Sequence, residues 1–278
     1  MDCVYCQLGS AGSTTVRRRE FVPVARILAE VKAVLASNRR VDAITFSGSG
    51  EPTLHAGIAK VIRGIKRMTD IPVVVLTNSS SFANDAARRD LLDADIVVPS
   101  LDAAAPDVFR RVNRPHKDLV LGDIISGLER FRREYKGRIW LEIMLVRGVN
   151  DSPDHLRALE RAVTRIKPDK IQLNTVVRPP AEPSAKPLDR VDLERIRALF
   201  GPKAEIIADF NKKERRPDGE DVAKTVLATV RRRPVTADDI ALALGRAQEE
   251  IAGPLVHLLA EGKIKVVEHK GRSYFENR

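Results

Sequence analysis

The two cysteines of the chain, Cys3 and Cys6, lie within its opening sequence M-D-C-V-Y-C-Q. Two thiols at this spacing can form a redox disulfide, bind zinc or hold part of an iron–sulfur cluster. A thioredoxin-like pair would follow a buried strand, and this sequence offers none before the cysteines. Zinc and iron–sulfur sites need further ligands, and the five histidines show no paired spacing that would complete a zinc site. The pair alone leaves all three kinds of chemistry open.

A second polar motif follows the first apolar, β-branched run. Residues 41–52 read V-D-A-I-T-F-S-G-S-G-E-P, and a helical pattern begins shortly after them. This order predicts a strand, a glycine turn and a helix start, with Glu51 at the end of the turn. An isolated Gly-x-Gly usually serves only to give a βα turn its positive φ angles. The motif indicates a binding function only in combination with Cys-x-aromatic-Cys.

Together the two motifs resemble those of the radical S-adenosylmethionine (radical SAM) superfamily. Its hallmark is Cys-x-x-x-Cys-x-x-Cys with an aromatic residue before the last cysteine, then a Gly-Gly-Glu-Pro-like motif after the second barrel strand. Cys3, Tyr5 and Cys6 match the end of the first motif, and residues 48–52 match the second. The continuation Tyr-Cys-Gln and the sequence Ser-Gly-x-Gly-Glu-Pro-Thr-Leu are similar to the wyosine-forming tRNA enzymes, over residues 1 to about 210.

The first cysteine of the hallmark would fall before Met1. The resemblance therefore implies that this sequence lacks the first barrel strand and the first cluster ligand, through truncation or a start codon placed too late. As written, the chain is expected to hold a cluster poorly. A loss of function within the family is the alternative.

The resemblance implies a [4Fe–4S] cluster and SAM as cofactors, and an electron donor such as flavodoxin or ferredoxin. Cys3 and Cys6 would be two of the iron ligands. The residues that the resemblance and their positions after the strands assign to SAM are Tyr5, Gly48, Gly50, Glu51, Asn78, Ser100, Asp102 and Asn174. The implied reaction is cleavage of SAM to a 5′-deoxyadenosyl radical, which abstracts a hydrogen atom from the substrate.

Substrate contacts can be assigned only by position. Arg114, Arg147 and Asn150 follow expected strands or helices near the predicted mouth, where they could grip a phosphate or carboxylate or merely cap neighbouring helices. Because the wyosine-forming relatives modify a tRNA base, RNA is the expected partner. A formal net charge of +10 suits a polyanion, although an arginine-rich composition explains it equally well.

The elements that would position these residues alternate between strand and helix. Apolar, β-branched runs predict strands at 43–46, 73–77, 96–100, 139–146, 170–175 and 204–208. A helical pattern at 24–35 precedes the first of these runs, and others separate them at 58–68, 124–135 and 155–166. Repeated βα units with continuously apolar strands predict an α/β fold with a parallel sheet, here a partial (βα) barrel. Ligands of such folds collect beyond the carboxyl ends of the strands.

The last part of the chain changes character. Residues 178–188 contain four prolines and predict an extended loop or lid. A charged linker at 211–220 is expected to separate the partial barrel, 1–210, from a domain at 221–278. Helical patterns at 221–232, 236–244 and 248–261, followed by two short strands around 269–272, predict a winged helix-turn-helix.

The charges of this predicted module point in two directions. The wing carries cations that suit phosphates: Lys263, Lys265, Lys270 and Arg272. Glu249, Glu250 and Glu261 on the third helix would instead be repelled by a nucleic-acid backbone. A catalytically inactive barrel fused to a winged-helix nucleic-acid-binding regulator is therefore the alternative function.

Length and composition fit a cytoplasmic enzyme. The 278 residues contain no apolar stretch near the roughly 18 residues of a membrane span, so no membrane partner is expected. No signal peptide precedes Cys3, and two cysteines provide no disulfide framework, which indicates a reducing compartment.

Overall fold

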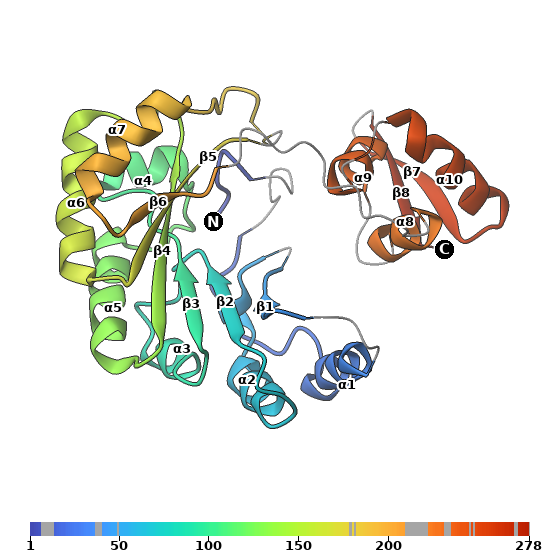
Figure 1. Ribbon diagram of the computed structural model, residues 1–278, viewed down its shortest axis with the longest axis horizontal. Coiled ribbons are helices and arrows are strands. Elements are labelled where there is room, and N and C mark those ends of the chain that lie inside the picture. The colour runs from blue at the N-terminus through green and yellow to red at the C-terminus, as the bar shows by residue number, and fades with distance from the viewer. Residues whose placement is uncertain are drawn as a thin grey trace. The chain divides into compact units, whose positions relative to one another are not determined.

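The computed structural model describes residues 1–6, 14–36, 41–48, 50–177, 180, 182–208, 222–230, 235–244, 246, 248–269 and 272–277. The chain divides into two compact units, Met1–Ala208 and Asp209–Arg278 (Figure 1). The predicted linker at 211–220 and Lys270 lie outside the described residues, as does part of the predicted lid. Within the described part, no helix has the length and apolar character needed to span a membrane.

The first unit is built on a parallel sheet of six strands in the order β1-β2-β3-β4-β5-β6. The strands are β1 (Ile44–Phe46), β2 (Val73–Thr77), β3 (Ile96–Pro99), β4 (Arg138–Leu145), β5 (Lys170–Thr175) and β6 (Ala204–Ile206). Every neighbouring pair is parallel and consecutive in the chain, as in an open section of a (βα) barrel. The predicted α/β class and parallel sheet are confirmed.

Helices connect the strands and cover one face of the sheet (Figure 1). They are α1 (Val24–Leu35), η1 (Pro52–Leu54), α2 (Ile58–Lys66), α3 (Asp85–Arg89), α4 (Pro106–Val112), α5 (Leu121–Glu134), α6 (Pro153–Ile166) and α7 (Arg190–Phe200). The predictions at 24–35, 58–68, 124–135 and 155–166 are confirmed within a few residues at each end. The sequence analysis did not name α3, α4 or α7, of which the first two are too short to show a clear helical period.

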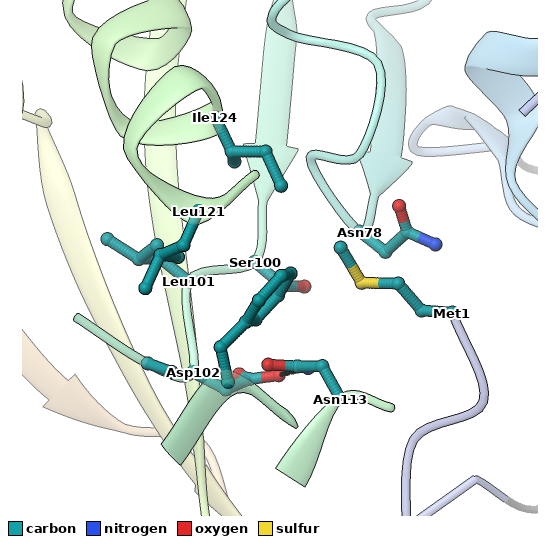
Figure 2. Close-up of a pocket in the computed structure, with 10 residues that line it drawn as sticks. Met1, Asn78, Ser100, Leu101, Asp102, Asn113, Leu121 and Ile124 are labelled. Atoms are coloured by element: carbon teal, nitrogen blue, oxygen red, sulfur yellow. Dashed lines mark hydrogen bonds between the residues drawn. The ribbon is translucent and has the colours of Figure 1, made fainter. Parts of the chain in front are cut away.

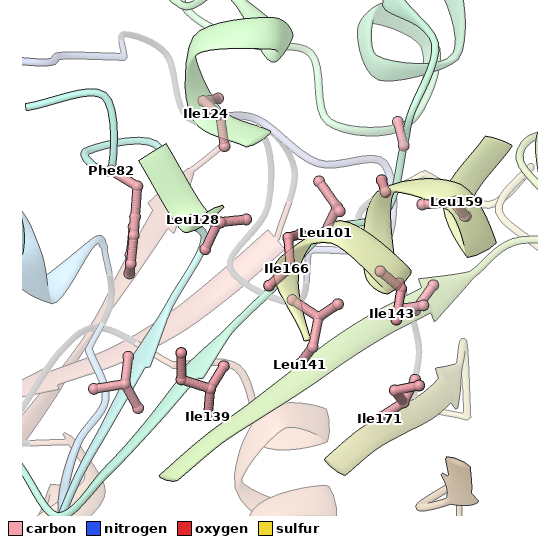
Figure 3. Close-up of a cluster of buried hydrophobic side chains, with 14 of the residues drawn as sticks. Phe82, Leu101, Ile124, Leu128, Ile139, Leu141, Ile143, Leu159, Ile166 and Ile171 are labelled. Carbon is pink, nitrogen blue, oxygen red and sulfur yellow. The ribbon is translucent and has the colours of Figure 1, made fainter. Parts of the chain in front are cut away.

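Strand β4 shows how the two faces of the sheet differ. Leu141, Ile143 and Leu145 are fully buried and belong to the core with side chains of α5 and α6, such as Leu128 and Leu159 (Figure 3). The alternate side chains, from residues 140, 142 and 144, are only half-buried. Because successive side chains of a strand point to opposite faces, the helices cover the outer face, and the side chains of the inner face keep partial exposure.

The second unit contains three helices and a two-stranded antiparallel sheet. Its elements are α8 (Val222–Val230), α9 (Ala237–Leu244), α10 (Gln248–Ala260), β7 (Ile264–His269) and β8 (Arg272–Asn277). A separate core joins them, with Val226, Ile240, Ile251 and Leu255 almost completely buried. The predicted helices and the strand pair are present, and the winged-helix assignment stays a prediction.

Candidate functional site

Polar residues from neighbouring strands meet at the carboxyl ends of the sheet. Asn78 follows β2, and Ser100 and Asp102 follow β3; all three line one pocket together with Met1 (Figure 2). The remaining lining residues are Leu101, Ala103, Phe109, Asn113, Leu121 and Ile124. This is the end of a parallel sheet at which ligands bind in α/β folds.

Backbone hydrogen bonds fix the N-terminal segment beside this pocket. The Val4 amide donates to the Val112 carbonyl at 3.0 Å, and the Asp2 amide donates to the Asn113 carbonyl at 3.1 Å. The Cys6 amide donates to the Cys3 carbonyl at 2.9 Å, which closes a tight turn between the two cysteines. Both thiols therefore lie on a turn that is anchored to the end of α4.

Asp102 joins this segment to the sheet. Its Oδ2 accepts hydrogen bonds from the Tyr5 hydroxyl at 2.5 Å and from Asn113 Nδ2 at 2.6 Å. Its Oδ1 accepts from the Met144 amide at 2.9 Å. Asn113 Nδ2 also lies 3.4 Å from Cys3 Sγ, so one amide contacts both the carboxylate and the thiol. Asp102, which was predicted to contact SAM, has its side chain occupied by these protein donors.

Burial controls the ionisation of this network. Burial raises the pKa of Asp102, although the hydrogen bonds from Tyr5, Met144 and Asn113 oppose the shift. Burial, with the nearby Asp102 carboxylate as a second cause, raises the pKa of Cys3 to about 11. The same two causes raise the pKa of Tyr5 well above its usual value. Without a metal, Cys3 is a protonated thiol at neutral pH.

Glu51 joins the turn after β1 to the end of β2. Its Oε1 accepts from the Thr53 amide at 3.0 Å, the Thr53 hydroxyl at 2.5 Å and the Thr77 hydroxyl at 2.6 Å. Its Oε2 accepts from the Asn78 amide at 2.7 Å. A Cβ atom added at Gly50 would meet nothing within 4 Å, so open space remains beside this turn. The predicted SAM contacts of Gly48, Gly50 and Glu51 stay predictions.

A family model described as the radical SAM superfamily matches residues 1–159, which is more than half of the chain. The chain belongs to the radical SAM superfamily. The structure brings the turn that carries both cysteines to the same end of the sheet as four of the predicted SAM residues. These are Tyr5, Asn78, Ser100 and Asp102. The wyosine-like subfamily is not shown by this match.

Relatives are known over most of the chain. A UPF0026 protein of Methanocaldococcus jannaschii is 30% identical over 282 residues, which cover 99% of this chain and 87% of that protein, so the chain also belongs to the UPF0026 family. A protein named GTPase Obg, from Brachyspira hyodysenteriae, is 36% identical over 95% of this chain, which spans only 39% of that protein.

More distant similarities cover a smaller share of the chain. A protein named dual-specificity RNA methyltransferase RlmN, from Nitratidesulfovibrio vulgaris, is 29% identical over 66% of this chain and 50% of its own length. The crystal structure of Streptococcus suis SuiB bound to S-adenosylmethionine superposes with a TM-score of 0.54 at 15% identity, over 75% of this chain and 47% of that one. This structural likeness shows the fold alone.

The donor set of this radical SAM chain fits a [4Fe–4S] cluster only in part. Neither Cys3 nor Cys6 forms a disulfide, and both lie on one turn. Such a cluster takes three or four thiolates, and this sequence holds two cysteines. Among the described residues, no group of three or more His, Cys, Asp or Glu side chains is placed to hold a metal ion. Two thiolates alone would leave the cluster one protein ligand short.

Asn174 lies on the inner face of the sheet beside a residue that the sequence analysis missed. Asn174 Nδ2 donates to Glu142 Oε1 at 2.9 Å, and Asn174 Oδ1 accepts from the Thr175 amide at 2.9 Å. Glu142 lies within β4, whereas the site residues were predicted from the ends of the strands. A glutamate with three apolar residues on either side of it in the strand is the sequence signal that could have identified it.

The three predicted substrate contacts make structural interactions. Arg114 pairs with Glu182 at 2.7 Å, and Arg147 pairs with Asp189 and Asp192 at 3.1 Å each. Asn150 is fully buried. Its amide nitrogen donates to the carbonyls of Asp102 and Met144, and its amide oxygen accepts from the Val146 amide. These contacts favour a structural role over a substrate contact. The alternative reading placed the three residues as caps of neighbouring helices, whereas the structure pairs them with carboxylates and backbone groups.

Proposed function

We propose that this chain is a radical SAM iron–sulfur enzyme of the wyosine-like kind, which cleaves SAM and abstracts a hydrogen atom from an RNA base. The observation that supports it best is the Asp102 network. Through Tyr5 and Asn113, one buried carboxylate connects the cysteine turn to the strand ends that carry Asn78 and Ser100. A cluster held on that turn and SAM held at that rim would be neighbours.

The cofactors would supply the chemistry and the chain would orient them. Cys3 and Cys6, together with a third thiolate, would hold the [4Fe–4S] cluster, and that cofactor would supply the electron for the reductive cleavage of SAM. The Asp102 network would keep the cysteine turn in place, and Asn113 would donate a hydrogen bond to the Cys3 sulfur. Hydrogen bonds to cluster sulfurs are one of the means by which proteins adjust reduction potential.

An RNA substrate is supported by two observations. One relative carries the name of an RNA methyltransferase, and its similarity extends over 66% of this chain. The chain also carries a formal net charge of +10, which favours association with a polyanion. The wyosine-like motifs add a tRNA base as the specific expectation.

For the second unit we retain the winged-helix assignment, with a role secondary to that of the barrel. Lys263 pairs with Glu261 at 2.9 Å, and Lys265 pairs with Glu276 at 2.8 Å. Cations already paired with carboxylates have less to gain from phosphates. This pairing gives no support to the alternative of a nucleic-acid-binding regulator with an inactive barrel.

The proposal can be tested by adding a third cysteine to the protein. An N-terminal extension with a cysteine two residues before Met1 creates Cys-x-x-x-Cys-x-x-Cys together with Cys3 and Cys6. After anaerobic reconstitution, we expect about four irons per chain and release of 5′-deoxyadenosine from SAM. The same extension carrying Cys6→Ala is the control and should lose both. An extended chain that binds no iron, or that binds the cluster and leaves SAM intact, would contradict the proposal.

A further inference from the structure

Glu142 is a half-buried carboxylate on the inner face of the sheet. It lies within β4, just before the carboxyl ends of the strands. In the parallel ladder it lies between Ser100, which forms a bridge with it, and Gln172 of β5. Two residues further along β4, the Met144 amide donates to Asp102. Side chains two residues apart on a strand share a face, so Glu142 and Met144 point into the same space.

Protein groups satisfy only one oxygen of this carboxylate. Glu142 Oε1 accepts the 2.9 Å hydrogen bond from Asn174 Nδ2. Among the described residues, Glu142 Oε2 has no hydrogen-bond donor, and no lysine, arginine or histidine forms an ion pair with the side chain. Lys170, a cation on this face, pairs with Glu205 at 3.3 Å and lies 5.0 Å from the Trp140 ring centroid.

A carboxylate in this position costs stability unless a donor reaches it. Burial raises the pKa of Glu142, and the hydrogen bond from Asn174 only partly opposes that shift. Perturbed carboxyl groups of this kind concentrate at functional sites. The free oxygen can accept N–H donors, whereas a phosphate or carboxylate would be repelled by Glu142 and Asp102 together.

We propose that Glu142 is a specificity residue that holds a substrate group bearing N–H donors, such as an amidine-like edge or an amino group, against the inner face of the sheet. The inference rests on the proposed function, because it assigns the substrate side of the same site. Asn174 orients the carboxylate through Oε1 and leaves Oε2 for the ligand. Anionic parts of the substrate, such as phosphates, then lie outside this face.

The chain supplies its own reporter for a test. Trp140 is its single tryptophan and lies two residues before Glu142 on the same face of β4. Benzamidine and benzoate are probes of similar shape, of which only benzamidine carries N–H donors. We expect saturable quenching of Trp140 fluorescence by benzamidine, with benzoate binding at least ten-fold more weakly.

Single substitutions test whether benzamidine binds at Glu142. Glu142→Gln should weaken benzamidine binding ten-fold or more, and Glu142→Asp, with a shorter side chain, should weaken it less. Glu205→Gln changes the neighbouring carboxylate on the same face and should leave the affinity within about two-fold of the unmodified chain. Thermal denaturation of each variant checks that it folds.

Equal binding of the two probes would overturn the inference, as would benzamidine binding that survives Glu142→Gln in a folded protein. The assay uses the chain without cluster or SAM. A failure of SAM cleavage in the extended protein and a failure of this binding are therefore observed separately.

Discussion

The hydroxyl of Tyr5 donates a 2.5 Å hydrogen bond to the carboxylate of Asp102, which lies 97 residues further along the chain. Tyr5 lies between the two cysteines in the sequence, and Asp102 lies in the segment that follows β3. The bond therefore ties the turn that carries both thiols to the centre of the sheet. Several measurable consequences follow from this network and from the residues around it.

Asp102→Asn should destabilise the first unit by about 3 kcal/mol, because an amide NH₂ group would then face the donors of Tyr5 or Asn113 inside the protein. Urea denaturation monitored by Trp140 fluorescence measures the loss. Asp107→Asn, at an exposed position of α4, is the matched control and should change stability little. A loss equal to that of the control would show that the network does not hold the fold together.

Cys3 should react slowly with iodoacetamide in the metal-free protein. A pKa of about 11 leaves only a small thiolate fraction at pH 8, so alkylation should be roughly 100-fold slower than that of an unfolded cysteine. The measurement uses Cys6→Ser, so that Cys3 is the only thiol, and compares it with a peptide of residues 1–6 carrying the same change. Equal rates for protein and peptide would refute the burial of Cys3.

Stability should fall as the pH drops below about 6.5 because of His155. His155 is 5% exposed, with Nδ1 donating to the Asn150 carbonyl and Nε2 accepting from the Ala104 amide. Burial lowers the pKa of His155, so the unfolded chain binds the proton more tightly and protonation favours unfolding. The loss occurs between about pH 6.5 and the lowered pKa of the folded state.

Titration of unfolding free energy against pH tests the assignment to His155. Other groups titrate in the same range, so the informative quantity is the difference between the curves of the unmodified protein and His155→Gln. We expect His155→Gln to have a flatter curve than the unmodified protein. Parallel curves for the unmodified protein and His155→Gln would exclude this histidine as the cause.

Glu142→Gln should raise stability at pH 7 by about 1 kcal/mol. Because burial raises the pKa of Glu142, the folded state binds a proton more tightly than the unfolded state does. Stability therefore falls as the pH rises from about 4.3 through the raised pKa, and the Gln variant avoids that loss. The gain should be smaller at pH 5 than at pH 7, as urea denaturation at the two pH values would measure.

Gly127→Ala should destabilise the protein by about 2 kcal/mol. A Cβ atom at Gly127 would lie 2.2 Å from the Phe82 carbonyl oxygen, so α5 would have to move away from the chain after β2. Gly122→Ala in the first turn of the same helix is the control, since its Cβ would meet nothing within 4 Å. That change should be neutral or stabilising, because alanine is the better helix former. Thermal denaturation distinguishes the two variants.

Local sequence pattern was sufficient to predict the sheet and the main helices. β-Branched apolar runs and helical periods depend on neighbouring residues, and they identified all six strands of the first unit and the helices α1, α2, α5 and α6. The cysteine motif and the glycine turn before Glu51 are also contiguous, and they indicated the superfamily. The short helices α3 and α4 were missed, because five and seven residues are too few for a clear period.

Only the tertiary structure decided what the polar side chains contact. The sequence alone proposed Asp102 as a SAM contact and Asn150 as a substrate contact, whereas the fold buries both in hydrogen bonds to other protein groups. The fold also places Asn113 and Glu142 in the site. Asn113 contacts Cys3, which is 110 residues away in the chain, and Glu142 contacts Asn174, which is 32 residues away. Local pattern determines which strands and helices form, because it acts through adjacent residues. The partner of a buried polar group depends on which distant segments come together in the folded unit, and packing across the whole unit determines those neighbours.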